Sequence, residues 1–112
     1  MKLAIIVRKD LDMRTGKVAG QVGHASVTAY RYATKEIAGK WFNEGQKKII
    51  LKVANEQELK DVGKLAIAND LQVWDIHDFG LTQVAPDTLT CIAIGPDTDE
   101  RLDKVIKDLK LF

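Results

Sequence analysis

The segment LAIIV at residues 3–7 is an uninterrupted apolar run. Such a run is typical of a strand covered on both faces, as in α/β proteins. Further strands are predicted at 48–53, 72–77 and 89–94, with helical patterns at 16–33, 35–44 and 55–68 and after Asp97. Helical crossovers between the first three strands favour parallel pairing, because parallel neighbours need long connections.

The connection between the third and fourth strands is short and has no helical pattern, which suits an antiparallel return. We therefore predict a single α/β domain over residues 1–112, with three layers. Its sheet should be mixed and four-stranded, with three parallel strands plus one antiparallel strand, flanked by helices. We expect Gly95-Pro96 to stop the fourth strand, and Asp97 with Glu100 to cap the last helix.

The bulk composition is that of an ordinary globular protein, with 46% hydrophobic and 29% charged residues. Cys91 is the single cysteine, which excludes an intrachain disulfide. No apolar run approaches the roughly 20 residues needed to span a bilayer. The first strand begins next to Met1 and leaves no room for a signal peptide, so we expect a cytoplasmic location and no membrane contact.

Charge is unevenly distributed along the chain, although the net charge is only +1. Residues 1–56 carry 11 Lys and Arg against 5 Asp and Glu, giving +6, whereas residues 57–112 carry 6 against 11, giving −5. Such asymmetry is a hint of polyanion binding on one face. Composition alone favours the alternative that solvated surface charges segregated by chance, because the two halves need not form separate faces.

Polar side chains share one narrow sector of the helix predicted at 16–33. This polar stripe continues in register to residue 35 and comprises Lys17, Gln21, His24, Thr28, Arg31 and Lys35. About 100° round the same helix runs an apolar stripe of Val18, Val22, Ala25, Ala29 and Ala33. The apolar stripe should pack on the sheet, which leaves the polar stripe free to build a site.

Lys17 lies in the first turn of this helix, directly after Gly16. A phosphate-binding loop is not present, because Leu11 and Val18 stand where that pattern needs Gly and Ser or Thr. A helix N-terminus still offers free N–H groups and positive potential, and Lys17 adds a full charge there. The position suits a phosphate, a carboxylate or a developing oxyanion. The alternative is a solvated first-turn lysine, although a lysine there opposes the helix dipole.

Asp78 follows the third strand and precedes a Gly-containing turn. It can accept a proton from water or orient Lys17, or it can simply cap the turn through its own backbone, and spacing leaves these alternatives open. Ligands of open α/β sheets bind beyond the carboxyl ends of the parallel strands. This topology brings Lys17, Asp78, Thr82 and Thr90 to one rim of the sheet.

Other chemistries find little support in the spacing of residues. A lone mid-helix histidine such as His24 is more often structural than catalytic. His77 adjoins Asp78, yet no HxxH, HExxH or CxxC spacing is present, so we expect no metal site. Cys91 falls inside a predicted strand, where a thiol usually behaves as an inert small hydrophobe.

Three linked segments resemble one known family in their order and spacing. They are GKVAGQVGHA at 16–25, DFGLTQVAP at 78–86 and TCIAIGP at 90–96, followed by the similar ending LKLF at 109–112. The first resembles the motif GK(I/V)AAQ-x-x-HA of the type II peptidyl-tRNA hydrolases of archaea and eukaryotes, and the second resembles their motif DAGxTQ(I/V)AP. The departures are Gly20 for Ala, Gly23 for a small or hydroxyl residue, and Phe79 for the small residue of DAG.

The resemblance implies hydrolysis of the ester that joins a peptide to the 3′ ribose of tRNA, with no metal or organic cofactor. On that basis Asp78 is expected to orient or deprotonate water, directly or through Thr82, while Lys17 and the helix N-terminus stabilise the oxyanion. Hydrogen bonds from Thr90 and Gln21 would fix the acceptor end, with His24, Thr28 and Gln83 as substrate contacts. Basic residues form an expected phosphate track for tRNA, namely Arg8, Lys9, Arg14, Arg31, Lys35, Lys47 and Lys48.

Three rival functions remain open at this level. The first is a non-catalytic RNA-binding module on the same fold, the second is an esterase or amidase acting on a small acyl substrate, and the third is a protein-interaction scaffold. The carboxylate at the rim argues against the first, and the basic half argues against the second. A small-residue face at Gly20, Gly23 and Val27 lies away from both stripes, and we expect a homodimer contact or ordinary packing there.

Overall fold

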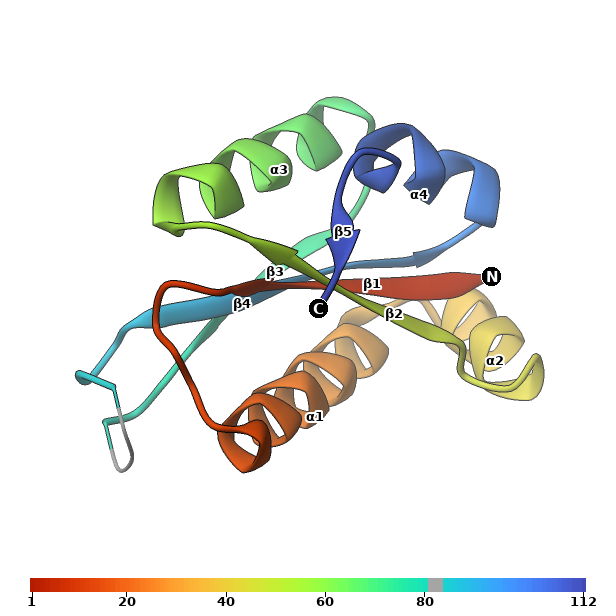
Figure 1. Ribbon diagram of the computed structural model, residues 1–112. Coiled ribbons are helices and arrows are strands. Elements are labelled where there is room, and N and C mark those ends of the chain that lie inside the picture. The colour runs from red at the N-terminus through yellow and green to blue at the C-terminus, as the bar shows by residue number, and fades with distance from the viewer. Residues whose placement is uncertain (81–83) are drawn as a thin grey trace.

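The computed structural model describes residues 1–80 and 84–112 of the chain. Within those residues a mixed sheet has the strand order β3-β4-β1-β2-β5, with helices on both sides (Figure 1). The elements in chain order are β1 (Lys2–Arg8), α1 (Thr15–Tyr32), α2 (Lys35–Asn43), β2 (Lys48–Val53), α3 (Glu56–Ala68), β3 (Val73–His77), β4 (Leu89–Asp97), α4 (Asp99–Ile106) and β5 (Lys110–Leu111).

The apolar run at residues 3–7 forms most of β1, at the centre of the sheet, and all of it is buried. Its side chains alternate between two cores, as the pleat of a strand requires. Leu3, Ile5 and Val7 pack with α1 and α2, whereas Ala4 and Ile6 pack with α3 and α4. The prediction of a strand covered on both faces is confirmed.

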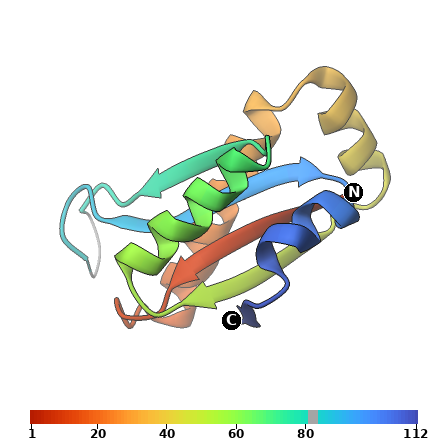
Figure 2. The ribbon, with the colours of Figure 1, turned by 90° about the horizontal axis from the view of Figure 1, so that it is seen from above.

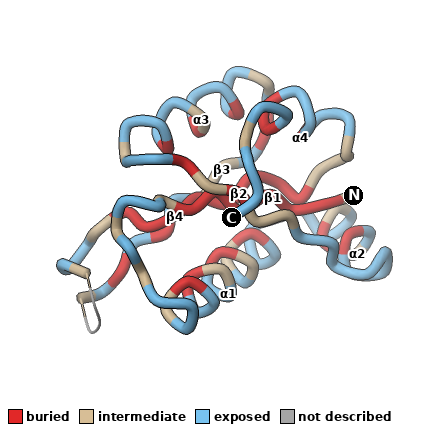
Figure 3. The backbone as a smooth tube through the Cα atoms, viewed as in Figure 1, coloured by how far each residue is buried: buried red, intermediate tan, exposed pale blue. Residues whose placement is uncertain are grey.

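Within the described part of the chain, two helices cover each face of the sheet. Helices α1 and α2 lie on one side and α3 and α4 on the other, and Figure 2 shows α3 and α4 crossing above the strands. Buried segments concentrate in the strands and on the inner helix faces (Figure 3). The chain is therefore an open three-layer α/β domain, as predicted. No helix among the described residues is long and apolar enough to cross a membrane.

The predicted strand count and pairing are wrong in two respects. The part of the chain that the structure describes has five strands, because β5 pairs antiparallel with β2. Parallel pairing among the described strands joins β1 only to β2, since β4 lies between β1 and β3 and is antiparallel to both. The pairing was wrong because crossover helices give β1, β2 and β3 a common direction without making the three strands neighbours. The strand count was wrong because a two-residue strand such as β5 is too short to show a periodic pattern.

Two predicted boundaries near the C-terminus are also wrong. Strand β4 continues through Gly95-Pro96 to Asp97, and Pro96 is tolerated because the register with β1 shifts there. The cap of α4 is Thr98, whose side chain accepts a hydrogen bond from the Arg101 amide, while Asp97 accepts from the Thr98 amide. Helices α2 and α3 are capped by Thr34 and Asn55, whose side chains accept hydrogen bonds from the Ile37 and Glu58 amides.

The polar stripe is shorter than its periodicity indicated. Helix α1 ends at Tyr32, and Ala33 and Thr34 adopt extended backbone before α2 begins. Lys35 therefore lies on α2 and not in the α1 stripe. At the other end, α1 begins near the edge of the sheet where β1 and β3 end and β4 starts, as Figure 1 shows. That edge is the predicted rim.

Candidate active site

Lys17 and Asp78 meet at this rim, 61 residues apart in the chain. The ammonium of Lys17 forms an ion pair and hydrogen bond with Oδ1 of Asp78. Both side chains are largely withdrawn from solvent, with 12% of Lys17 and 6% of Asp78 exposed. A buried carboxylate is costly unless a partner compensates its charge, and Lys17 supplies that compensation. The predicted convergence of these two residues is confirmed.

Gln21 adds a second donor to the same oxygen. It lies one turn after Lys17 on α1, and its Nε2 donates to Oδ1 of Asp78 at 3.3 Å. Gln21 is buried although the rest of the polar stripe is exposed or half-buried. Lys17 and Gln21 together hold one edge of the carboxylate through charge and geometry.

The other oxygen of Asp78 is bound by the turn that follows it. Oδ2 accepts a hydrogen bond from the Gly80 amide at 2.7 Å. Gly80 has φ +80°, and a Cβ there would lie 2.5 Å from Cγ of Pro86. The carboxylate thus makes two kinds of contact, because Oδ2 caps the turn while Oδ1 faces Lys17. Sequence reasoning missed the contribution of Gly80, although the Asp-x-Gly spacing was a usable signal.

Thr90 lies at a β-bulge directly beside this turn. Ile76 is opposite Cys91 and His77 is opposite Leu89, so Thr90 is an extra residue in β4. Its side chain is 0% exposed, and the hydroxyl donates to the Ile76 carbonyl at 3.2 Å. Thr90 thus fixes the end of β3, two residues before Asp78.

Among the residues that the structure describes, no side-chain hydrogen bond from the N-cap residue closes the start of α1, and its first turn has no acidic residue. Its N-cap residue is Arg14, and Lys17 lies in that first turn. A helix start of this kind presents amide donors and positive potential. The site therefore combines a carboxylate, an ammonium and a helix N-terminus, which is a set of groups suited to acyl-transfer chemistry.

His24 lies on the same side of α1 as Gln21 and faces Phe79. Their ring centroids are 6.4 Å apart with an interplanar angle of 27°. Both residues are exposed, so this ring pair lies at the surface next to the Lys17–Asp78 pair. Thr28 is half-buried one turn further along α1. Thr82 and Gln83, also predicted as site residues, lie outside the residues that the structure describes.

Cys91 is a buried free thiol on β4. Burial raises its pKa to about 11, so the thiolate is scarce at neutral pH. Its sulfur lies 3.9 Å from the Gln21 carbonyl and packs against α1. The predicted role as an inert small hydrophobe agrees with this environment.

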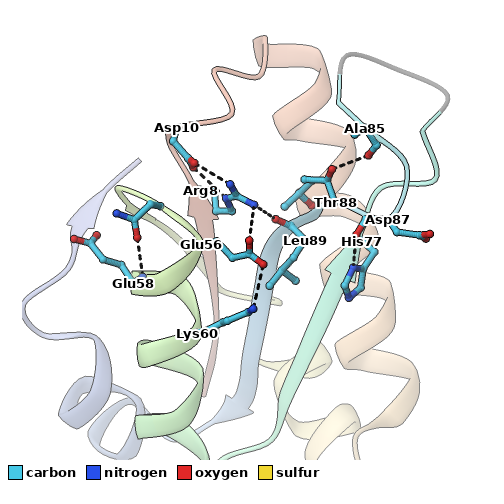
Figure 4. Close-up of polar contacts among 12 residues, drawn as sticks. Arg8, Asp10, Glu56, Glu58, Lys60, His77, Ala85, Asp87, Thr88 and Leu89 are labelled. Carbon is cyan, nitrogen blue, oxygen red and sulfur yellow. Dashed lines mark hydrogen bonds and ion pairs between the residues drawn. The ribbon is translucent and has the colours of Figure 1, made fainter.

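Arg8, at the end of β1, is held in an ion-pair network that β4 separates from the end of β3 (Figure 4). Its guanidinium bonds both carboxylate oxygens of Asp10, donates to the Leu89 carbonyl at 3.0 Å, and lies 3.8 Å from Glu56. The hydrogen bonds from Arg8 hold the pKa of Asp10 below its usual value, and Asp10 raises the pKa of Arg8. A phosphate contact by Arg8 would compete with these bonds.

The other predicted phosphate contacts are distributed over the surface. Lys9 lies 4.3 Å from the ring centre of Phe112, and Lys48 lies 5.3 Å from that of Trp41. Arg31 lies near the C-terminal end of α1, roughly 21 Å along the helix axis from Lys17 at 1.5 Å per residue. The structure thus places the basic residues at both ends of α1 and does not gather them at the rim.

No group of three His, Cys, Asp or Glu side chains within residues 1–80 and 84–112 is arranged to hold a metal ion. His77 Nδ1 instead lies 3.0 Å from the Asp87 carbonyl, within hydrogen-bond distance (Figure 4). An apolar cavity of about 640 Å³ lies elsewhere, between α1 and the β2–β5 edge, and its lining includes Lys9 and Lys48. Lys17 and Asp78 do not line that cavity.

Comparison with known proteins places the chain in a family. The family model described as "Peptidyl-tRNA hydrolase PTH2" matches residues 1–112. The chain belongs to this family. Relatives named "Peptidyl-tRNA hydrolase" include proteins of Thermoplasma acidophilum, 42% identical over 99% of this chain and 97% of the relative, and of Nanoarchaeum equitans, 45% identical over 96% of each. A relative from Methanococcus maripaludis is 46% identical over 97% of each chain.

Membership in the PTH2 family confirms the resemblance stated from the three sequence segments. The first two segments meet in space, because residues of 16–25 bind the first residue of 78–86. The third segment contains Thr90 and supports β3 from the adjacent strand. The three motifs are thus joined by side-chain contacts at the rim of the sheet.

Proposed function

We propose that this chain hydrolyses the ester bond between a peptide, or an N-blocked amino acid, and the 3′ ribose of tRNA. The relatives carry the name of that activity. The observation that carries the proposal is the Lys17–Asp78 pair at the start of α1. Binding of RNA alone does not require a buried carboxylate at the acceptor site.

The chemistry requires water to attack the ester carbonyl, and the ribose oxygen to leave with a proton. Asp78 orients the water or accepts its proton, directly or through Thr82. The attack places negative charge on the carbonyl oxygen, which Lys17 and the N-terminal amides of α1 stabilise. An ammonium has three N–H donors, so Lys17 can hold Asp78 and still donate to the oxyanion.

The remaining polar residues hold the reacting groups in place. Gln21 orients the Asp78 carboxylate, and His24, Thr28 and Gln83 contact the acceptor end of the substrate. Thr90 enters as a positioning residue because its side chain is fully buried. Thr90→Val keeps the side-chain shape and should lower kcat with little change in KM, while Thr90→Ser should restore kcat. Wild-type kcat in Thr90→Val would remove Thr90 from the mechanism.

The two helical layers differ in charge, which supports binding of tRNA to one face. Helix α1 carries two basic and no acidic residues, and α2 carries two basic and one acidic residue. Helices α3 and α4, on the opposite face, each carry three acidic and two basic residues. A basic face attracts the polyanionic backbone of tRNA and aligns it with the rim.

Release of tRNA from N-acetyl-aminoacyl-tRNA with EDTA present tests the proposal. The wild-type chain should liberate free tRNA and the blocked amino acid with multiple turnovers. Salt-sensitive binding of tRNA without release would instead favour the non-catalytic RNA-binding module. Release of a blocked amino acid from a small ester at the same kcat/KM would favour an esterase of small acyl substrates.

We also propose a homodimer formed through the small-residue face of α1. Gly20, Gly23 and Val27 are exposed, and nothing lies within 4 Å of a Cβ built on either glycine, so the face admits a second helix. Sedimentation of the wild type and of Gly23→Arg tests this contact. A dimer that dissociates in the variant supports it, and a monomer for both refutes it.

A cytoplasmic location is proposed from the tRNA substrate. Fractionation of cells that produce the chain should recover it with the ribosome-free cytoplasmic fraction, and recovery with membranes would contradict the proposal.

A further inference from the structure

The exposed ring of Phe79 is the feature that the proposed chemistry leaves without a role. Phe79 is 75% exposed, although burial of a phenylalanine side chain is normally favourable. It directly follows Asp78, whose carboxylate is fixed by Lys17 and Gln21. The ring is therefore held within one residue of the proposed reaction centre.

Phe79 does not stand alone at that surface. The His24 ring lies near-parallel to it, with 6.4 Å between centroids, and both residues are exposed. His24 is two turns of α1 beyond Lys17, and Phe79 comes from the turn after β3, so two elements build the pair. The backbone under Phe79 is fixed as well, because Oδ2 of Asp78 binds the Gly80 amide.

We infer that Phe79 and His24 form a stacking platform for the base of the 3′-terminal nucleotide of the tRNA. This inference rests on the proposed hydrolysis of peptidyl-tRNA. Exposed aromatic rings stack unpaired bases of single-stranded RNA ends. The cleaved ester and the terminal base are attached to the same ribose, so the base must lie within one sugar of Asp78.

The nucleotide is a better occupant of the platform than the peptide. An enzyme that recycles tRNA from aborted translation meets peptides of every sequence, whereas the terminal nucleotide of the acceptor strand is constant. A ring pair whose Phe79 lies in a turn held by the Asp78–Gly80 hydrogen bond suits the constant part of the substrate. The platform also lies on the polar, basic side of α1, between Lys17 and Arg31, where the nucleic acid is expected.

Binding of short RNA tests the platform without requiring turnover. The probes are the trinucleotide CCA and the same oligonucleotide with an abasic 3′ residue. For the wild type, the abasic change should weaken binding roughly 5- to 150-fold, the range that corresponds to loss of one stacked base. Phe79→Leu keeps the apolar bulk without a ring, so it should bind CCA as weakly as the wild type binds the abasic probe. Phe79→Trp keeps a ring, so it should still bind CCA more tightly than the abasic probe.

The double comparison separates stacking from structural damage. Stacking predicts that Phe79→Leu and the abasic change are not additive, because either one removes the same contact. The platform would be overturned if Phe79→Leu lost the same factor of affinity for CCA and for the abasic probe. It would also be overturned if the wild type bound the two probes equally well. A second result would also overturn the platform. If the loss of hydrolysis in Phe79→Leu depends on the amino acid of N-acetyl-aminoacyl-tRNA, while its affinity for CCA does not depend on the terminal base, the peptide and not the base lies against Phe79.

The outcome is distinguishable from failure of the proposed function. Failure of the wild type to release tRNA refutes hydrolysis, whereas the trinucleotide experiment reports on the ring pair in either case. Ser26→Ala, on α1 outside the polar stripe, serves as the matched control and should leave both affinities unchanged.

Discussion

Gln21 and Asp78 are joined by a buried hydrogen bond, with 3.3 Å between Nε2 and Oδ1, across 57 residues of sequence. The same oxygen bonds the ammonium of Lys17. The amide thus restrains the direction in which the carboxylate points, while the ammonium supplies the compensating charge. Geometry and charge come from two residues one turn apart on α1.

Replacing Gln21 by Leu should lower kcat/KM about tenfold or more, because a hydrogen bond to a charged group contributes roughly 1.5–3 kcal/mol. The folded state loses the same hydrogen bond, so the melting temperature should fall by several degrees, while Lys17 still compensates the charge of Asp78. Gln57→Leu is the matched control, because Gln57 donates to the Asp61 carboxylate at 2.9 Å on the far side of the sheet. Loss of activity in both variants would contradict the role of Gln21.

Gly80→Ala should reduce both activity and stability. A Cβ would lie 2.5 Å from Cγ of Pro86, at a φ of +80° that disfavours side chains. The turn must open to relieve this clash, which removes the amide from Oδ2 of Asp78 and costs on the order of 1–3 kcal/mol. Thermal unfolding and hydrolysis, measured on the same preparation, check the prediction.

Gly20→Ala is the control for that substitution. Nothing lies within 4 Å of a Cβ on Gly20, and the residue is inside helix α1. Alanine there should raise helix stability by up to about 1 kcal/mol and leave hydrolysis intact. Similar behaviour of the two alanine variants would show that the turn at Gly80 does not depend on Pro86.

The buried thiol predicts a pH dependence of stability. Burial raises the pKa of Cys91 to about 11 from 9.0. The folded state therefore retains its proton while the unfolded state loses it, so stability is complete below pH 9 and falls as pH rises towards 11. The loss should reach roughly 3 kcal/mol, since each pKa unit corresponds to 1.36 kcal/mol.

Comparison of the wild type with Cys91→Ala isolates this contribution from lysine and tyrosine titration. The variant should be less stable at pH 8 because of the cavity, yet the difference in unfolding free energy should shrink as the pH approaches 11. A constant difference would contradict the thiol's assigned environment. Iodoacetamide should not modify the folded chain at pH 7.5, and Cys91→Ala should retain hydrolytic activity.

Binding of tRNA should weaken steeply as salt concentration rises, because counterions are released from the phosphates that lysine and arginine contact. Arg31→Gln and Lys35→Gln should each lower the slope of log Kd against log salt by about 0.7–0.9 per lost contact. Lys64→Gln, on the opposite face, should leave the slope unchanged. A flat salt profile of the wild type would refute the phosphate track.

Local periodicity predicted the parts of this site that depend on single elements. Lys17 and Gln21 recur one turn apart, and the crossover helices gave β1 and β3 a common direction, so Asp78 had to reach the rim. The neighbours of β3 could not be predicted in the same way. Strand β4 lies between β1 and β3 through non-local pairing, which no local pattern encodes.

Features that depend on contacts between distant segments could not be predicted from the sequence either. The bulge at Thr90 is visible only from the register of β4 against β3. Packing of Pro86 against Gly80 explains why the turn needs glycine, and only the folded loop shows it. Arg8 was predicted as a phosphate contact from its charge, while its bonds to Asp10 and Leu89 depend on the fold.

The most direct test of the central claim is the single-turnover rate of N-acetyl-aminoacyl-tRNA hydrolysis by Asp78→Asn beside the wild type, with EDTA present. Asparagine keeps the shape of the side chain and removes its charge, and its single acceptor oxygen can serve either Lys17 or the Gly80 amide but not both. The rate of Asp78→Asn should be at least about 100-fold lower, with an unchanged circular dichroism spectrum and a tRNA affinity within about twofold of the wild type. A folded Asp78→Asn variant that cleaves at the wild-type rate would contradict it.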